Sequence, residues 1–135
     1  GNESGDINYQ VSFQVINAMS ISDVQNHPNP FIDFTRFGYT LTGDRSPDFY
    51  QIEIANVDGE IVRVLTKDDL GELRVGKHLT DYKFYGTDKE GRHLPAGIYF
   101  YRLTAEDSEG DNVKHRNVGI PLFKRQGWGK MIKIR

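Results

Sequence analysis

Short segments in which apolar and polar residues alternate recur along this chain of 135 residues, and this period of two constrains the fold more than any other feature. The alternation is clear over residues 9–16, 37–41 and 52–54. Successive side chains of a strand point to opposite faces of its sheet, so each segment predicts a strand with one buried face. The nearest approach to a helical turn, over 67–73, is interrupted by Gly71.

Turn signals separate the predicted strands. Asp58 and Gly59 lie between two β-rich runs, 50–56 and 60–65. An Asp-Gly pair in this position is a strong hairpin signal, because both central residues of the turn can adopt positive φ. Residues 98–105 form a longer run that is apolar on both faces at its start, which predicts a central strand of a sheet.

The later part of the chain predicts weaker strands. A turn at 108–111 is followed by a polar return strand over 113–118 and by a short final strand over 131–134. Phe100 is expected to lie buried between two sheets, so that its replacement by Ala would cost roughly 3–5 kcal/mol. A set of about seven or eight short strands with turns between them predicts an all-β fold, an antiparallel β-sandwich.

The composition and the scattered reactive residues exclude several classes of function. The net charge of −2 provides no basic field to hold nucleic acid or an anionic membrane, and no apolar run approaches the roughly 18 residues that a membrane span requires. The absence of cysteine excludes disulfide scaffolds, cysteine-ligated zinc and cysteine nucleophiles. His27, His78, His93 and His115 are not spaced as a ligand pair on one strand or helix. We therefore expect no catalytic residue, no cofactor and no metal, and a domain that is not an enzyme.

Residues 26–30 form a stiff, extended segment, because each of its two prolines biases the preceding residue away from helix. The compact module is expected to begin near Ile21 and to span 21–135. Residues 1–20 are then a strand or linker from a preceding domain, since the chain begins at Gly1 without a methionine and looks like part of a larger protein.

Short motifs occur along the chain in a particular order. Asn29-Pro30-Phe31 precedes a strand, and Asp58-Gly59 marks a hairpin. Further along lie Gly86, Asp88, Gly91, Leu94, Gly97 and Tyr99, and the final hexapeptide is Lys130, Met131, Ile132, Lys133, Ile134 and Arg135. This layout, over 21–135, resembles the C-terminal sorting domains of Bacteroidetes surface proteins, which pass through the type IX secretion system. The block over 86–101 also resembles the Ig-like domain of flagellar hook-capping proteins.

The resemblance implies an Ig-like fold and a non-catalytic targeting domain that directs its parent protein through the outer membrane to the cell surface. The implied partner is the outer-membrane secretion machinery, with no part for nucleic acid or a membrane span. The parent would thus be an exported protein of the outer membrane or cell surface. The recognised element would be the final strand, an edge strand with Lys130 and Lys133 facing solvent, which a partner's strand can extend.

Two further expectations concern the end of the chain. Residues 117–129 look like an insertion into the layout and indicate a specialised member, retained rather than cleaved. The cysteine-peptidase sortase of the same secretion system is similar to such a case and is one candidate for the parent protein.

The alternative function is an Ig-like or carbohydrate-binding module attached to a surface hydrolase. Trp128, Tyr82, Tyr85 and Phe123 would then form an aromatic platform for a sugar.

Overall fold

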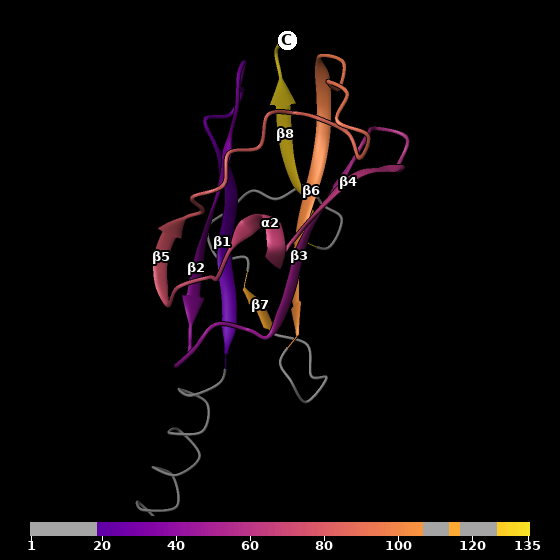
Figure 1. The fold of residues 1–135 in the computed structure, drawn as a ribbon. Coiled ribbons are helices and arrows are strands. Elements are labelled where there is room, and N and C mark those ends of the chain that lie inside the picture. Colours follow the sequence, from indigo (N-terminus) through magenta and orange to yellow (C-terminus); the bar gives the residue numbers. More distant parts are fainter. Residues whose placement is uncertain (1–18, 107–113, 117–126) are drawn as a thin grey trace, which may run out of the picture.

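The computed structural model describes residues 19–106, 114–116 and 127–135 (Figure 1). The strand expected over 9–16 lies outside the described residues, as does the turn expected at 108–111. In chain order the elements are β1 (Ser20–His27), β2 (Arg36–Thr42), β3 (Phe49–Ala55), β4 (Ile61–Thr66), α2 (Lys67–Leu70), β5 (Gly76–Leu79), β6 (Gly97–Glu106), β7 (Lys114–Arg116) and β8 (Gly129–Lys133).

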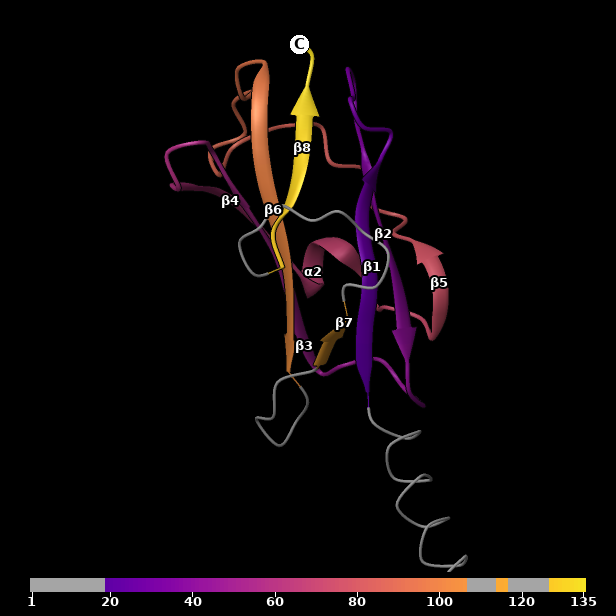
Figure 2. The same ribbon diagram turned by 180° about the vertical axis from the view of Figure 1, so that it is seen from behind.

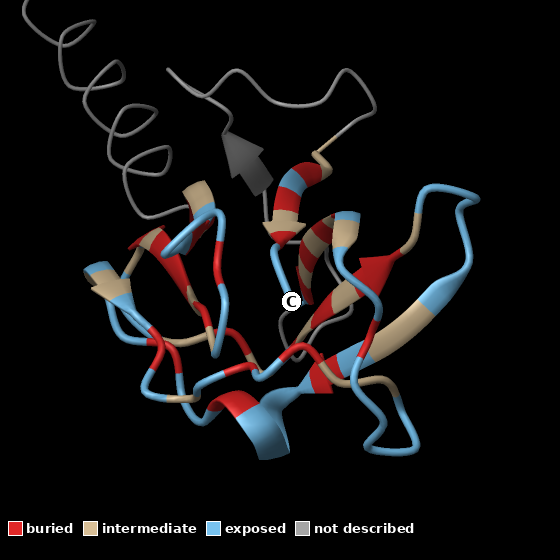
Figure 3. Ribbon diagram, turned by 90° about the horizontal axis from the view of Figure 1, so that it is seen from above, coloured by how far each residue is buried: buried red, intermediate tan, exposed pale blue. Residues whose placement is uncertain are grey.

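The strands form two sheets that pack face to face, as the two opposite views in Figures 1 and 2 show. One sheet has the order β5-β2-β1-β7 and the other the order β4-β3-β6-β8. The strand pairs are antiparallel, apart from the parallel pair of β1 and β7. The single-turn helix α2 lies between the two layers at one side of the molecule (Figure 3). This arrangement confirms the predicted all-β sandwich of mostly antiparallel sheets, with one parallel pair added.

The strand β7 differs from the expected return strand. It was predicted to turn back after the strand over 98–105, but it pairs with β1 of the other sheet, from Ser20 opposite Lys114 to Ser22 opposite Arg116. The reason lies in the neighbours of β6, which is paired with β3 on one edge and with β8 on the other. Both edges of β6 are therefore occupied, so β7 cannot pair with β6 and pairs with β1 instead.

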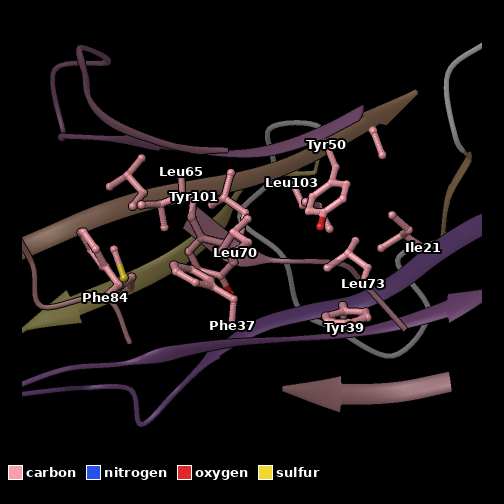
Figure 4. Packing of buried hydrophobic residues seen from close by; sticks show 14 of the residues in the cluster. Ile21, Phe37, Tyr39, Tyr50, Leu65, Leu70, Leu73, Phe84, Tyr101 and Leu103 are labelled. Carbon is pink, nitrogen blue, oxygen red and sulfur yellow. The ribbon is translucent and has the colours of Figure 1, made fainter. Parts of the chain in front are cut away.

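Apolar side chains from the facing sides of the two sheets fill the space between them, as the close view in Figure 4 shows, and Figure 3 marks the buried positions along the ribbon. The inward positions of β2 and β6 follow the period of two that the sequence predicts. The core residues from these two strands are Phe37, Tyr39 and Leu41 of β2 and Tyr99, Tyr101, Leu103 and Ala105 of β6.

The prediction for Phe100 is wrong. Its neighbours Tyr99 and Tyr101 are the buried residues of β6, whereas Ile98 is 40% exposed and Phe100 is half-buried on the outer face of the sheet. Phe100 shares that face with Arg102 further along the strand. A guanidinium group needs water or a partner, so its position fixes the outer face and places Phe100 there too.

The hairpin predicted around Asp58 and Gly59 is confirmed, but its turn is longer than a two-residue Asp-Gly turn. Gly59 has φ of +89°, whereas among the described non-glycine residues only Asp23 has a positive φ. The Asn56 amide donates to the Glu60 carbonyl at 2.9 Å, so the loop runs over 56–60. The expected positive φ at Asp58 is therefore wrong, and Gly59 alone supplies the left-handed conformation of this turn.

Candidate functional site

The final strand β8 extends the sheet by pairing with β6, from Gly97 opposite Lys133 to Tyr101 opposite Gly129. Lys133 is buried with 4% of its surface exposed, whereas Lys130 is exposed. Positions three apart in a strand lie on opposite faces, because the side-chain period is two. The prediction that both lysines face solvent is therefore wrong: Met131 and Lys133 point into the sandwich, while Lys130 points outward.

The outer edge of β8 is covered by the corner at Asn29-Pro30-Phe31. The Asn29 carboxamide donates from Nδ2 to the Lys130 carbonyl and accepts at Oδ1 from the Ile132 amide, each at 3.0 Å. The Phe31 amide donates to the Ile132 carbonyl at 3.0 Å, and its carbonyl accepts from the Ile134 amide at 2.9 Å. Phe31 and Lys133 form a parallel bridge. The expected open edge is therefore already occupied by a segment of the same chain.

Buried polar side chains hold this corner in place. The Asn26 side chain, at the end of β1, donates to Thr35 Oγ1 at 3.1 Å, and Thr35 Oγ1 donates to the Pro28 carbonyl at 2.8 Å. Both residues are buried, and the Thr35 backbone pairs with Phe84 in both directions at 2.9 Å. The peptide bonds before Pro28 and Pro30 are cis. Sequence reasoning missed Asn26 and Thr35; a polar residue on each side of the two prolines is the signal that it overlooked.

Gly86 lets Lys133 and Phe31 pack against the chain. A Cβ at Gly86 would lie 2.5 Å from Lys133 Cε and 3.4 Å from Phe31 Cε2, and Gly86 also has φ of +72°. The Gly86 carbonyl accepts from the Leu94 amide at 2.8 Å. The Lys133 ammonium group donates to the backbone oxygen of Arg135. The structure thus brings together Phe31, Gly86, Leu94 and Lys133, which the sequence analysis had singled out from distant positions.

The remaining motif residues form turns away from this contact. Asp88 Oδ1 accepts from the Glu90 and Arg92 amides, each at 2.9 Å, and Gly91 has φ of +84°, so these residues form a turn exposed to solvent. The hydrogen bonds from the Arg92 backbone are the main reason that the pKa of Asp88 lies below its ordinary value. Asn56 plays the same part in the first hairpin, where its Oδ1 accepts from Asp58 and Glu60. Sequence reasoning had given that hairpin's role to Asp58.

The aromatic residues of β6 anchor the inner side of the site. The Tyr99 hydroxyl donates to the Pro95 carbonyl at 2.6 Å, just before β6 begins at Gly97, and burial raises its pKa. The Tyr101 ring packs edge-on against Phe37 at 5.4 Å between ring centroids. Burial raises the pKa of Tyr101 to about 12, although a hydrogen bond with the Asn26 backbone partly opposes the shift. Tyr101 therefore stays neutral at ordinary pH, and from β6 it contacts Phe37 of β2 and the backbone at the end of β1.

The aromatic platform expected for a sugar is dispersed. Trp128 lies 4.5 Å from the Arg102 guanidinium, while Tyr85 packs against Phe34 and the Tyr82 hydroxyl accepts from Arg63 at 3.2 Å. Phe123 and most of the expected insertion over 117–129 lie outside the described residues. Trp128 does border a shallow groove of about 550 Å³ on the outer face of the sheet, which Val57, Ile98, Phe100 and Lys130 also line.

No family model matches the chain, and no curated protein matches it either. Over 19–106, 114–116 and 127–135, no helix is long and apolar enough to cross a membrane. In the same described residues, no group of three or more His, Asp or Glu side chains is placed to hold a metal ion.

Proposed function

We propose that this chain is a non-catalytic sorting domain, which directs its parent protein through the outer membrane to the cell surface by type IX secretion. One observation carries the proposal. The motifs that resemble those of sorting domains lie far apart in the sequence, yet Asn29 and Phe31 bind the backbone of β8, and Gly86 packs against Lys133. A contact between the motifs gives a structural reason for their joint presence in the chain.

The geometry divides the final hexapeptide into two sets of residues. Met131 and Lys133 are buried, so they serve the fold. Lys130 is exposed, and no ion pair of its ammonium group is found among the described residues; Ile134 is 48% exposed. Exposed charges contribute little to stability and are available to a partner. The exposed residues of the final hexapeptide are therefore the surface that the secretion machinery would read.

The test uses a reporter fused to the N-terminal side of the domain in a bacterium that has type IX secretion. The unchanged domain should bring the reporter to the cell surface, and Lys130→Ala should lower its display while leaving the melting temperature within the small range usual for surface substitutions. The matched control is Lys77→Ala, which removes an exposed lysine from β5, an edge strand of the other sheet.

Two results would count against the proposal. A reporter that stays in the periplasm with the unchanged domain would exclude the sorting function. Equal display of Lys130→Ala and Lys77→Ala would exclude Lys130 from recognition. Lys133→Ala is unsuitable as a test, because its buried stem packs on Gly86 and Phe31 and its loss would disturb the fold.

A second candidate function is a carbohydrate-binding module, and the groove beside Trp128 favours it. Phe100 and Trp128 line the groove together with Asn56, and aromatic faces beside polar groups suit a sugar ring. Binding of the purified domain to soluble oligosaccharides, measured by calorimetry, tests this function. Binding that Trp128→Ala abolishes would support it, whereas heats no larger than those of dilution would exclude it for the sugars used.

A further inference from the structure

A single exposed side chain closes part of the outer edge of β8. The Asn29 carboxamide occupies the Lys130 carbonyl and the Ile132 amide in the way that a peptide group of a neighbouring strand would, and both of these hydrogen bonds are exposed to solvent. Phe31 closes the next part of the edge differently. Its side chain is 1% exposed, and its own backbone bonds to Ile132 and Ile134. The contact at Phe31 is therefore secured by a buried ring, whereas the contact at Asn29 depends on two solvent-exposed hydrogen bonds.

We propose that Asn29 is a displaceable clasp, and that an extended segment of a partner protein takes its place as an added strand on β8. The inference rests on the proposed sorting function, which makes the partner a component of the secretion machinery. The Phe31–Lys133 bridge is parallel, so the added strand runs parallel to β8 in continuation of the corner. Backbone bonds provide affinity in such strand addition, and the outward Lys130 side chain lies beside the added strand to discriminate among partners.

The energetics favour exchange at Asn29 over exchange at Phe31. The net contribution of a hydrogen bond exposed to water changes an equilibrium constant by about tenfold or less. Two such bonds therefore favour the closed state of the clasp over the open state by roughly a hundredfold at most. Opening it returns the Lys130 carbonyl and the Ile132 amide to water, which satisfies them. Removing Phe31 would instead expose a fully buried ring next to Phe84, 6.4 Å away between centroids, and disrupt the core.

Amide hydrogen exchange measured by NMR tests whether the clasp opens. The Ile132 amide bonds to Asn29 and the Ile134 amide to Phe31, so we expect Ile132 to exchange at least about tenfold faster than Ile134 in the unchanged protein. Asn29→Ala should remove the remaining protection of Ile132 and leave Ile134 slow. Equal exchange at the two amides would mean that the clasp opens only with the whole edge, and would overturn the inference.

The display assay tests whether the opened edge is what the partner binds. Ile132 directs both its amide and its carbonyl toward the outer edge, so Ile132→Pro removes an edge donor without removing a bond to β6. We expect Ile132→Pro to lower display about tenfold or more, and Ile132→Ala, which keeps the amide, to lower it less. Asn29→Ala should raise the rate of display, because the edge is then open from the start.

Melting of each purified variant identifies those that are folded, and only folded variants are compared. A folded Ile132→Pro domain displayed at the unchanged level would exclude strand addition. Loss of display in folded Asn29→Ala would make Asn29 itself the recognised group, which also overturns the clasp. Both outcomes differ from failure of the sorting function, in which the unchanged domain would not be displayed at all.

Discussion

Gly129 is restricted to glycine by the space around it. A Cβ there would lie 2.6 Å from the Tyr101 hydroxyl oxygen and 2.7 Å from Cε1 of the same ring, which is itself buried. The backbone of Gly129 does not have a positive φ, so the conflict is steric alone. We predict that Gly129→Ala lowers the free energy of unfolding by roughly 1–3 kcal/mol, the usual cost of overpacking, as measured by denaturant titration.

The control for this prediction is a double-mutant cycle. In a Tyr101→Leu background the ring is gone, so the further change Gly129→Ala should cost much less than it does in the unchanged protein. Equal costs in the two backgrounds would mean that the alanine acts through the backbone of β8 and that the contact with Tyr101 is not its cause.

At the scale of the element, β6 demonstrates how one polar residue assigns the faces of a strand. Leu103 is 4% exposed, whereas Phe100 is half-buried on the opposite face. We predict that Leu103→Ala lowers the free energy of unfolding by roughly 2–5 kcal/mol and that Phe100→Ala lowers it by less, although Phe is the larger residue. Parallel thermal melts of the two variants check the order; a larger loss for Phe100→Ala would contradict the assigned faces.

The strands with a clear period of two could be predicted from the sequence, and β1 could not. Ile21 and Asn26, two of its buried residues, are five positions apart, which places them on opposite faces of a regular strand. They share a face because the register shifts between Ser22 and Gln25, where Asp23 adopts φ of +56°. A bulge of this kind erases the alternation that marks a strand. The outward face of Phe100 could also have been predicted, because Arg102 lies two positions further along the strand and therefore on the same face.

The candidate site was predictable in its residues and not in its contacts. The motif residues Asn29, Phe31, Gly86 and Lys133 were all identified from the chain, but their pairing depends on hydrogen bonds across the whole sequence. Local pattern carries no information about which distant backbone groups a side-chain amide will meet. The spacing of Lys130 and Lys133, by contrast, already implied opposite faces in any strand.

At the scale of the whole molecule, alkaline pH should unfold the domain through its buried tyrosines. Burial raises the pKa of both Tyr50 and Tyr101 from 10.0 to about 12, and the negative charge of Glu72 adds to the shift of Tyr50. Both lie in the core between the sheets (Figure 4). Because the unfolded chain loses these protons first, the contribution of the two tyrosines to the free energy of unfolding is constant below about pH 10 and falls as pH rises from about 10 to about 12.

The expected loss is roughly 2–3 kcal/mol for each ring across that interval. Denaturant titrations at a series of pH values, with tyrosinate absorbance followed in parallel, measure it. Tyr101→Phe should reduce the pH dependence by about half, since one of the two shifted groups is removed. A free energy of unfolding that stays constant up to pH 12 would contradict burial of the two hydroxyl groups.

The contact between Asn29 and Lys130 joins residues 101 positions apart, and this separation has a consequence in time. At a synthesis rate of about 5–20 residues per second, the corner leaves the ribosome roughly 5–20 seconds before the strand that it binds. During that delay Phe31 has no strand to pair with, and the core lacks Met131. The nascent chain therefore stays incompletely folded until residues 130–134 have emerged, and a protease or chaperone has its best access within that interval.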